Sequence, residues 1–268
     1  MAAELVEVAF KGNRTGIYSN PVGINLKTGD YVIVEAERGE DAGVVIALGR
    51  VVTLKELEEE PPRLMRLATP EDVNKIRTNR QEEEAAFDVC KEKIARHNLN
   101  MKLVDVEYQF DRNKLTFYFT SDQRVDFRQL VRDLAAKYRT RIELRQIGVR
   151  DEAKRIGGYG TCGYKLCCNT FMREFETITT QYAREQLLPM NPSKLSGVCG
   201  RLKCCLAFEK VFYVSELEKY PEIDETVKTP LGEGVVDKID IFHGIIYVRY
   251  PNDDMEKFTL KELQPDEA

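Results

Sequence analysis

The sequence predicts an α+β protein with four successive parts: a small β-rich N-terminal part, a central α-β-β-α-β layer, a cysteine-rich module and a C-terminal SH3-like β-barrel. Three observations predict it. Short β-type runs with glycine turns occur at both ends, helical and strand periodicities alternate in the centre, and six of the seven cysteines gather in one stretch. The boundaries fall at 1–60, 61–150, 151–218 and 219–268.

The composition is that of a globular protein with a substantial core, because 43% of the residues are apolar and 32% are charged. The net charge of −5 excludes a global basic field for nucleic acid. No apolar run reaches the roughly 20 residues that span a bilayer, and the N-terminus lacks the features of a secretory signal. We therefore expect a cytoplasmic protein with no transmembrane segment. Its reduced cysteines favour metal or redox chemistry over disulfides.

The N-terminal part contains three strand-like runs, at 5–10, 31–37 and 43–51. Turns rich in glycine and charged residues separate them, and strands this short and this closely spaced are typical of a small barrel or a curled sheet. An acidic linker that contains two prolines follows at 54–63.

A long helix is predicted from about residue 70. Apolar residues recur along one side of it at helical spacing, and the stripe consists of Val73, Ile76, Phe87, Cys90 and Ile94. Because Cys90 lies on this stripe, we interpret it as a buried core thiol, separate from the other six cysteines.

The rest of the central layer is a hairpin, a second helix and a strand. Alternating runs at 104–110 and 115–119 flank a turn, and a final strand covers 141–147. Between them, Asp126 and Gln129 have the spacing of a capping box at the start of a helix.

Helical and strand-like segments also lie on either side of the second cysteine run. The stretch 171–188 is predicted to be partly helical, and 229–260 contains three or four short strands with glycine turns. The latter pattern suits a small SH3-like barrel.

The strongest signal is a repeat of the pattern C-G-x-x-x-C-C, whose two copies start 37 residues apart. Because cysteine is rare, this repetition indicates a common role for both copies. The candidate cofactor and metal ligands are Cys162, Cys167, Cys168, Cys199, Cys204 and Cys205.

An iron–sulfur cluster is the interpretation we favour for these six thiols. Cysteines separated by four residues can loop around a cluster corner, and the glycine after the first cysteine lets the backbone turn closely. Six ligands would fill one four-cysteine site with two to spare, or provide incomplete sets that partner proteins complete. A structural zinc site more often shows cysteines two residues apart. Zinc, a metal-free dithiol switch and purely structural cysteines remain the alternatives.

Three segments resemble the bacterial polymerase-suppressor C-terminal-domain proteins: GGYGTCGYKLCCNTF, NPSKLSGVCGRLKCCLAFE and RLATPEDVNKIRTNRQEEEAA. The resemblance implies a non-enzymatic regulator that uses these six cysteines as ligands of 4Fe-4S clusters. It also implies a complex with two small helical partners, RicA and RicF. That complex would act with ribonuclease Y in mRNA maturation and influence sporulation, competence and biofilm development.

Arg139, Arg141 and Arg145 fall on one face of the predicted strand and would suit an RNA or partner contact. A solvated strand face is the simpler interpretation, and Glu143 on the same face weakens the RNA hypothesis.

Catalytic signals are weak. The glycines at 157–160 match no phosphate-loop pattern, and His97 and His243 belong to no catalytic motif. We therefore expect no enzymatic activity. An RNA-binding module with a structural zinc is the alternative function, and a thiol redox enzyme, which would show a C-x-x-C motif, has the least support.

Overall fold

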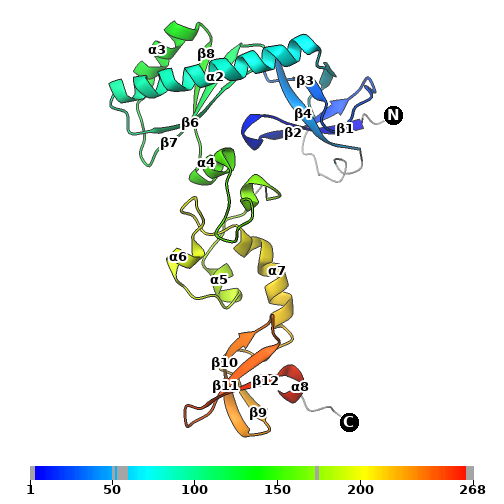
Figure 1. The fold of residues 1–268 in the computed structure, drawn as a ribbon, viewed down its shortest axis with the longest axis vertical. Coiled ribbons are helices and arrows are strands. Elements are labelled where there is room, and N and C mark those ends of the chain that lie inside the picture. The colour runs from blue at the N-terminus through cyan, green and yellow to red at the C-terminus, as the bar shows by residue number, and fades with distance from the viewer. Residues whose placement is uncertain (1–3, 50–51, 53–59, 173–174, 264–268) are drawn as a thin grey trace. The chain divides into compact units, whose positions relative to one another are not determined.

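The computed structural model describes residues 4–49, 52, 60–172 and 175–263. The chain divides into two compact units, one formed by residues 1–159 with 164–169 and the other by residues 160–163 with 170–268. Figure 1 shows the path of the chain from the blue N-terminal strands to the orange and red C-terminal sheet. Most of the predicted acidic linker, residues 54–59, lies outside the described residues.

The N-terminal part is a curled antiparallel sheet with the strand order β2-β1-β4-β3-β5. Ser19 at the β2 edge bridges to Arg63, and its N–H donates to the Pro62 carbonyl at 2.9 Å, so the two edges of the sheet meet. The predicted β-rich part is confirmed, and the structure adds β2 and β5 to it. Its elements are β1 (Glu4–Ala9), η1 (Lys11–Asn13), β2 (Thr15–Asn20), β3 (Tyr31–Glu35), β4 (Glu40–Leu48) and β5 (Leu64–Leu67).

The central layer has the predicted α-β-β-α-β order. Strands β6 and β7 form an antiparallel hairpin, and β8 pairs parallel with β7. A further helix, α4 (Val149–Ile156), follows the layer. The elements of the layer are α2 (Pro70–Arg96), β6 (Lys102–Tyr108), β7 (Lys114–Thr120), α3 (Arg128–Tyr138) and β8 (Arg141–Gln146).

The two helices of the central layer begin differently. Thr69 caps α2, because its side chain accepts from the Asp72 N–H while the Asp72 carboxylate accepts from the Thr69 N–H. The capping box expected at Asp126 is wrong, since α3 begins at Arg128 with Phe127 as its N-cap. The Asp126 carboxylate instead forms an ion pair with the Arg128 guanidinium, 2.5 Å away.

The helices α2 and α3 cover one face of the β6-β7-β8 sheet (Figure 1). Side chains of the two helices and of this face of the sheet pack together and form the main core of the first unit. Because side chains alternate along a strand, the opposite face carries the polar residues of the same strands. The buried core residues are Ala86, Cys90, Ile94, Leu103, Val106, Leu115, Phe117, Leu130 and Leu134.

Cys90 is a core residue, as the sequence predicts. Its exposed fraction is 0%, and burial raises the pKa of its thiol to about 12.

We expect a thiol-specific reagent to leave Cys90 unmodified in the native chain and to modify it after unfolding in guanidinium. The Cys90→Ala variant should lose one reactive thiol in the unfolded state and none in the native state. Loss of a native-state thiol in that variant would contradict this placement.

In its described residues, the second unit contains four helices and a C-terminal sheet with the strand order β12-β11-β10-β9, all antiparallel. The predicted strands are confirmed, whereas closure into an SH3-like barrel stays a prediction. Within the described ranges, no helix is long and apolar enough to cross a membrane. The elements are α5 (Gln181–Glu185), α6 (Pro192–Leu195), α7 (Cys205–Leu217), β9 (Thr226–Thr229), β10 (Gly232–Asp240), β11 (Ile245–Arg249), β12 (Met255–Thr259) and α8 (Leu260–Leu263).

Candidate thiolate site

The first cysteine run forms a tight hairpin after α4. Tyr159 and Lys165 form an antiparallel bridge, and within the loop between them the Gly163 N–H donates to the Gly160 carbonyl at 3.0 Å. Gly163 has a φ of 81°, a left-handed conformation that favours glycine. Cys162 is therefore held at the tip, immediately before this glycine.

The second cysteine run forms the same hairpin. Ser196 and Leu202 bridge, the Gly200 N–H donates to the Gly197 carbonyl at 3.0 Å, and Gly200 has a φ of 73°. Cys199 at this tip is the counterpart of Cys162.

The backbone bonds that follow the two tips also match. Leu166 N–H donates to the Gly158 carbonyl at 3.1 Å, and Lys203 N–H donates to the Leu195 carbonyl at 2.9 Å. Each bond in the first hairpin thus recurs 37 residues later, so the sequence repeat is also a structural repeat. The conformation of the two glycines explains why the pattern requires Gly after its first cysteine.

The paired cysteines of each copy begin a helical segment. Cys167 and Cys168 lie in the short 3-10 helix η2 (Cys167–Asn169), and Cys205 is the first residue of α7, with Cys204 as its N-cap. Each copy therefore places one thiol on a turn and two at a helix start.

The six thiols differ in burial. Cys162 is exposed and Cys168 is buried, with 4% of its surface exposed, while the other four are intermediate. Across the part of the chain that the structure describes, no three His, Cys, Asp or Glu side chains lie together as a metal site. The two hairpins thus provide ligands of a suitable kind on matching backbones.

The glycine conformation gives a direct test of the hairpin. Gly200→Ala should destabilise the second hairpin by about 1 kcal/mol, because a left-handed backbone is costly for an L side chain. No atom lies within 4 Å of a Cβ added at Gly200, so this cost is conformational. Gly197→Ala is the matched control, since Gly197 has no positive φ and a Cβ there makes ordinary contacts from 3.6 Å. Faster amide exchange at Lys203 in the first variant alone is expected, and equal exchange in both would contradict it.

The helical segment η2, which follows the first hairpin, is fixed to α4 inside the first unit. The Asn169 side chain donates to the Lys154 carbonyl at 2.7 Å, and the Asn13 side chain donates to the same carbonyl at 3.2 Å. The last turn of α4 therefore joins η2 to the N-terminal sheet.

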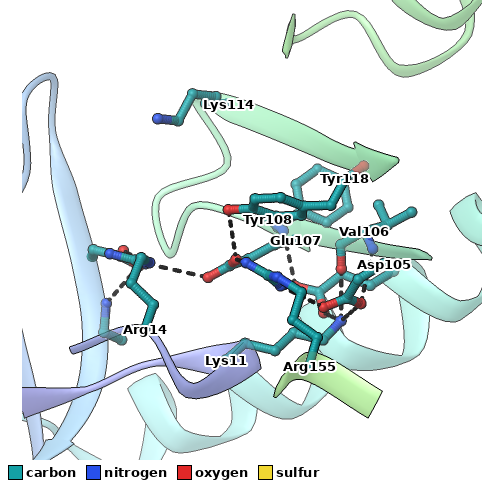
Figure 2. A network of polar contacts seen from close by, with 12 residues as sticks. Lys11, Arg14, Asp105, Val106, Glu107, Tyr108, Lys114, Tyr118 and Arg155 are labelled. Atoms are coloured by element: carbon teal, nitrogen blue, oxygen red, sulfur yellow. Dashed lines mark hydrogen bonds and ion pairs between the residues drawn. The ribbon is translucent and has the colours of Figure 1, made fainter. Parts of the chain in front are cut away.

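The next residue, Arg155, enters a network of polar contacts (Figure 2). Its guanidinium lies 2.7 Å from Asp105 and 3.7 Å from Glu107, and it stacks 3.5 Å over the Tyr118 ring. Burial, followed by the charge of Glu107, raises the pKa of Tyr118 to about 12.

Two further cations from the N-terminal part reach the same acids. Lys11 Nζ lies 2.7 Å from Glu83 and 2.8 Å from Asp105, while Arg14 lies 3.2 Å from Glu107 and 2.7 Å from Asp41. Figure 2 shows Lys11, Arg14 and Arg155 directed at the carboxylates of β6. The network thus ties the N-terminal sheet, the central layer and α4 together. Sequence reasoning missed it, because its members are far apart in the chain.

The three arginines proposed for RNA or partner contact are only partly brought together. Arg141 and Arg145 are exposed on β8, where they pair in register with Lys114 and Tyr118 of β7. The placement of Arg139 on that strand is wrong. It is the C-cap of α3 with a φ of 53°, so the chain changes direction before β8 begins.

Arg141 and Arg145 line a groove of about 960 Å³ within the first unit. Its lining mixes both signs of charge, since Arg14, Arg38, Lys114, Arg141 and Arg145 share it with Glu35, Glu37, Asp41, Glu60, Glu107 and Glu143. Lys114 and Glu143 form an ion pair at 3.4 Å. The groove is therefore not a uniformly basic surface, and the RNA hypothesis stays a prediction.

Both histidines pair with a nearby carboxylate. His97 Nε2 lies 3.0 Å from Asp133, and His243 Nδ1 lies 2.9 Å from Asp240. His97 thus links the end of α2 to α3, whereas the His243 pair lies within one turn after β10.

Two parts of the chain match known protein families. The PSP1 C-terminal conserved region matches residues 62–147, which cover the central layer, and the PSP1-like third domain matches residues 177–220, which include the second hairpin. No solved structure matches the chain.

The chain belongs to the PSP1 C-terminal family, as the cysteine runs and the start of α2 predict. It is a homologue of the stage 0 sporulation protein YaaT of Bacillus subtilis strain 168, with 43% identity over 97% of this chain and 94% of that protein. An uncharacterized protein of Schizosaccharomyces pombe is 35% identical over 50% of this chain and 22% of its own length. Protein PSP1 of Saccharomyces cerevisiae is 26% identical over 52% and 26%, respectively.

Proposed function

We propose that this chain is a non-enzymatic regulatory adaptor of the RicT/YaaT type that carries thiolate-ligated iron–sulfur clusters in the cytoplasm. The observation that carries the proposal is the repeated hairpin, which presents the same three thiols twice on the same backbone. A structural disulfide or an isolated reactive thiol would not require two matching copies. A thiolate centre that draws on both copies accounts for the match.

The donor set suits a 4Fe-4S cluster, which is held by four cysteine thiolates in an all-cysteine site. Such a cluster would supply a redox- and iron-sensitive link between its ligands. We propose that thiols of the two hairpins, or of a hairpin and a partner protein, serve together as ligands when a cluster is held.

The complex is the second element of the proposal. We propose that the adaptor assembles with RicA-like and RicF-like partners and acts with ribonuclease Y in mRNA maturation. Control of sporulation, competence and biofilm development would follow from that role. The 43% identity to the stage 0 sporulation protein YaaT over nearly the whole chain supports a role in the same process.

The proposed mechanism couples the cluster to assembly. Cysteines at the hairpin tips and helix starts would hold the two runs together, and this shapes the surface that partners meet. Loss of the cluster would release the runs and weaken the complex, so iron or redox state would control assembly.

Anaerobic purification of the full chain tests the centre. Brown protein with broad absorbance near roughly 400 nm, together with bound iron and sulfide, is the expected result. If the protein is colourless and contains stoichiometric zinc, the result contradicts the iron–sulfur proposal and supports the alternative, an RNA-binding module with a structural zinc. Exposed Arg141 and Arg145 favour that alternative most directly, since arginines neutralise phosphates. Protein without metal would contradict both.

A further inference from the structure

Aromatic and aliphatic side chains form a continuous exposed patch in the second unit. Phe208, Val211 and Phe212 on α7 are 60%, 76% and 49% exposed. The Phe171 ring packs 4.8 Å from that of Phe208, and the Phe242 ring stacks 6.1 Å from that of Phe212. The α7 patch is defined as Phe171, Phe208, Val211, Phe212 and Phe242.

The patch follows one side of a helix, because positions 208, 211 and 212 have the spacing i, i+3, i+4. Leu206 is the one α7 residue buried among those that the structure describes, so the second unit leaves most of this apolar helix uncovered.

The patch is large enough to be an interface. Since an aromatic side chain buries about 150–250 Å², these half-exposed side chains present roughly 500 Å². That lies at the upper end of what monomers expose, and it is more than half of the about 800 Å² that one partner contributes to a stable interface.

The charges beside the patch favour one kind of occupant. Glu209 is exposed next to Phe208, and Glu216 lies two turns further along the same side of the helix. Lys210 is directed away, to Glu185 at 3.2 Å and to the Tyr182 ring at 4.6 Å. Among the described residues of α7, the edge of the patch is therefore mainly acidic, although Lys219 pairs with Glu216 at 2.7 Å.

This edge disfavours two other occupants. An antiparallel pairing of two copies of α7 centred near Phe212 would bring Glu209 within about one turn of Glu216 of the other copy, and like charges in contact are repulsive. Single-stranded nucleic acid would stack on the aromatic rings, but its phosphates would meet carboxylates in place of lysine or arginine.

We propose that the α7 patch binds an amphipathic helix of a partner protein, with apolar residues at helical spacing and lysine or arginine beside Glu209. Side-chain ridges of such a helix fit between those of α7, as in helix-in-groove recognition. The inference rests on the proposed function in taking the partner to be one of the RicA-like and RicF-like proteins.

Because α7 begins at Cys205, the helix that carries the docking surface also carries, at its start, the last cysteine of the second copy of the repeat.

The test uses the full chain and the RicA-like and RicF-like proteins of the same organism, all purified anaerobically. Phe208→Ser with Phe212→Ser should weaken assembly at least about tenfold, as is typical for buried aromatic anchors. Glu209→Lys should weaken it as well, while bound iron and sulfide stay unchanged in both variants. Leu231→Ser is the matched control, because Leu231 is 67% exposed in the same unit but lies outside the patch.

The outcomes separate this inference from the proposed function. Assembly that is unchanged in the double variant overturns the α7 patch as the docking site and leaves the adaptor function standing. If neither partner assembles with the unsubstituted chain, both fail. A dimer by light scattering that the double variant loses identifies a second copy as the occupant and overturns the proposal. Binding of a polyuridine oligonucleotide that the double variant loses also overturns it, in favour of nucleic acid.

Discussion

The double variant Cys167→Ser, Cys204→Ser is expected to lose bound iron and sulfide and to assemble poorly with its partners. The two substitutions remove one thiol of the helix-start pair from each hairpin, at positions that correspond across the 37-residue repeat. Serine is a poor ligand for iron held by soft thiolates. Since loss of a supporting residue alone costs about 10–100-fold in metal affinity, loss of two ligands should reduce iron content at least about tenfold.

Iron and sulfide analysis of anaerobically purified protein, followed by gel filtration with the partners, measures both effects. Cys90→Ala is the control, because Cys90 lies in the core of the first unit and should leave both readouts unchanged. Iron content that equals that of the unsubstituted chain would exclude Cys167 and Cys204 as required ligands. Normal assembly in a variant without iron would refute the proposed coupling while the cluster itself remained.

The candidate site could be predicted from the sequence because its signal is local. A rare residue repeats in a fixed pattern, and the required conformation of Gly163 and Gly200 follows from the residue type. The central layer could be predicted for the same reason, since the periodicities of α2, β6 and β7 are each contained within one segment. Cys90 could be separated from the other cysteines by its position on the apolar stripe of α2.

Features that depend on contacts between residues far apart in the chain could not be predicted from the sequence. Arg155 follows no motif, and its importance arises because Asp105 and Tyr118 lie opposite it in the folded chain. The exposed side of α7 was missed because apolar residues at 208, 211 and 212 would suit a buried helix equally well. Arg139 was misplaced because the strand-like spacing of the arginines does not reveal that α3 ends there in a left-handed turn.

Arg155→Ala is expected to destabilise the first unit by about 3–5 kcal/mol, the usual cost of removing one partner from a buried ion pair. The Arg155 side chain is only 9% exposed, and its loss leaves Asp105 and Glu107 with less compensating positive charge. It also removes the guanidinium from the face of Tyr118. Because Lys154 accepts the hydrogen bond from Asn169, loosening of α4 should extend to the first thiol hairpin.

Guanidinium unfolding measures the loss of stability, and amide exchange in α4 and at Asn169 measures its spread to the hairpin. Arg128→Ala provides the control, because Arg128 also pairs with a carboxylate, Asp126, but its side chain is 84% exposed. Exposed pairs contribute little, so the control should unfold at the same denaturant concentration as the unsubstituted chain. If Arg155→Ala behaves like this control, the polar network does not stabilise the unit. If it lowers stability but leaves exchange at Asn169 unchanged, η2 and the hairpin before it are held independently of the network.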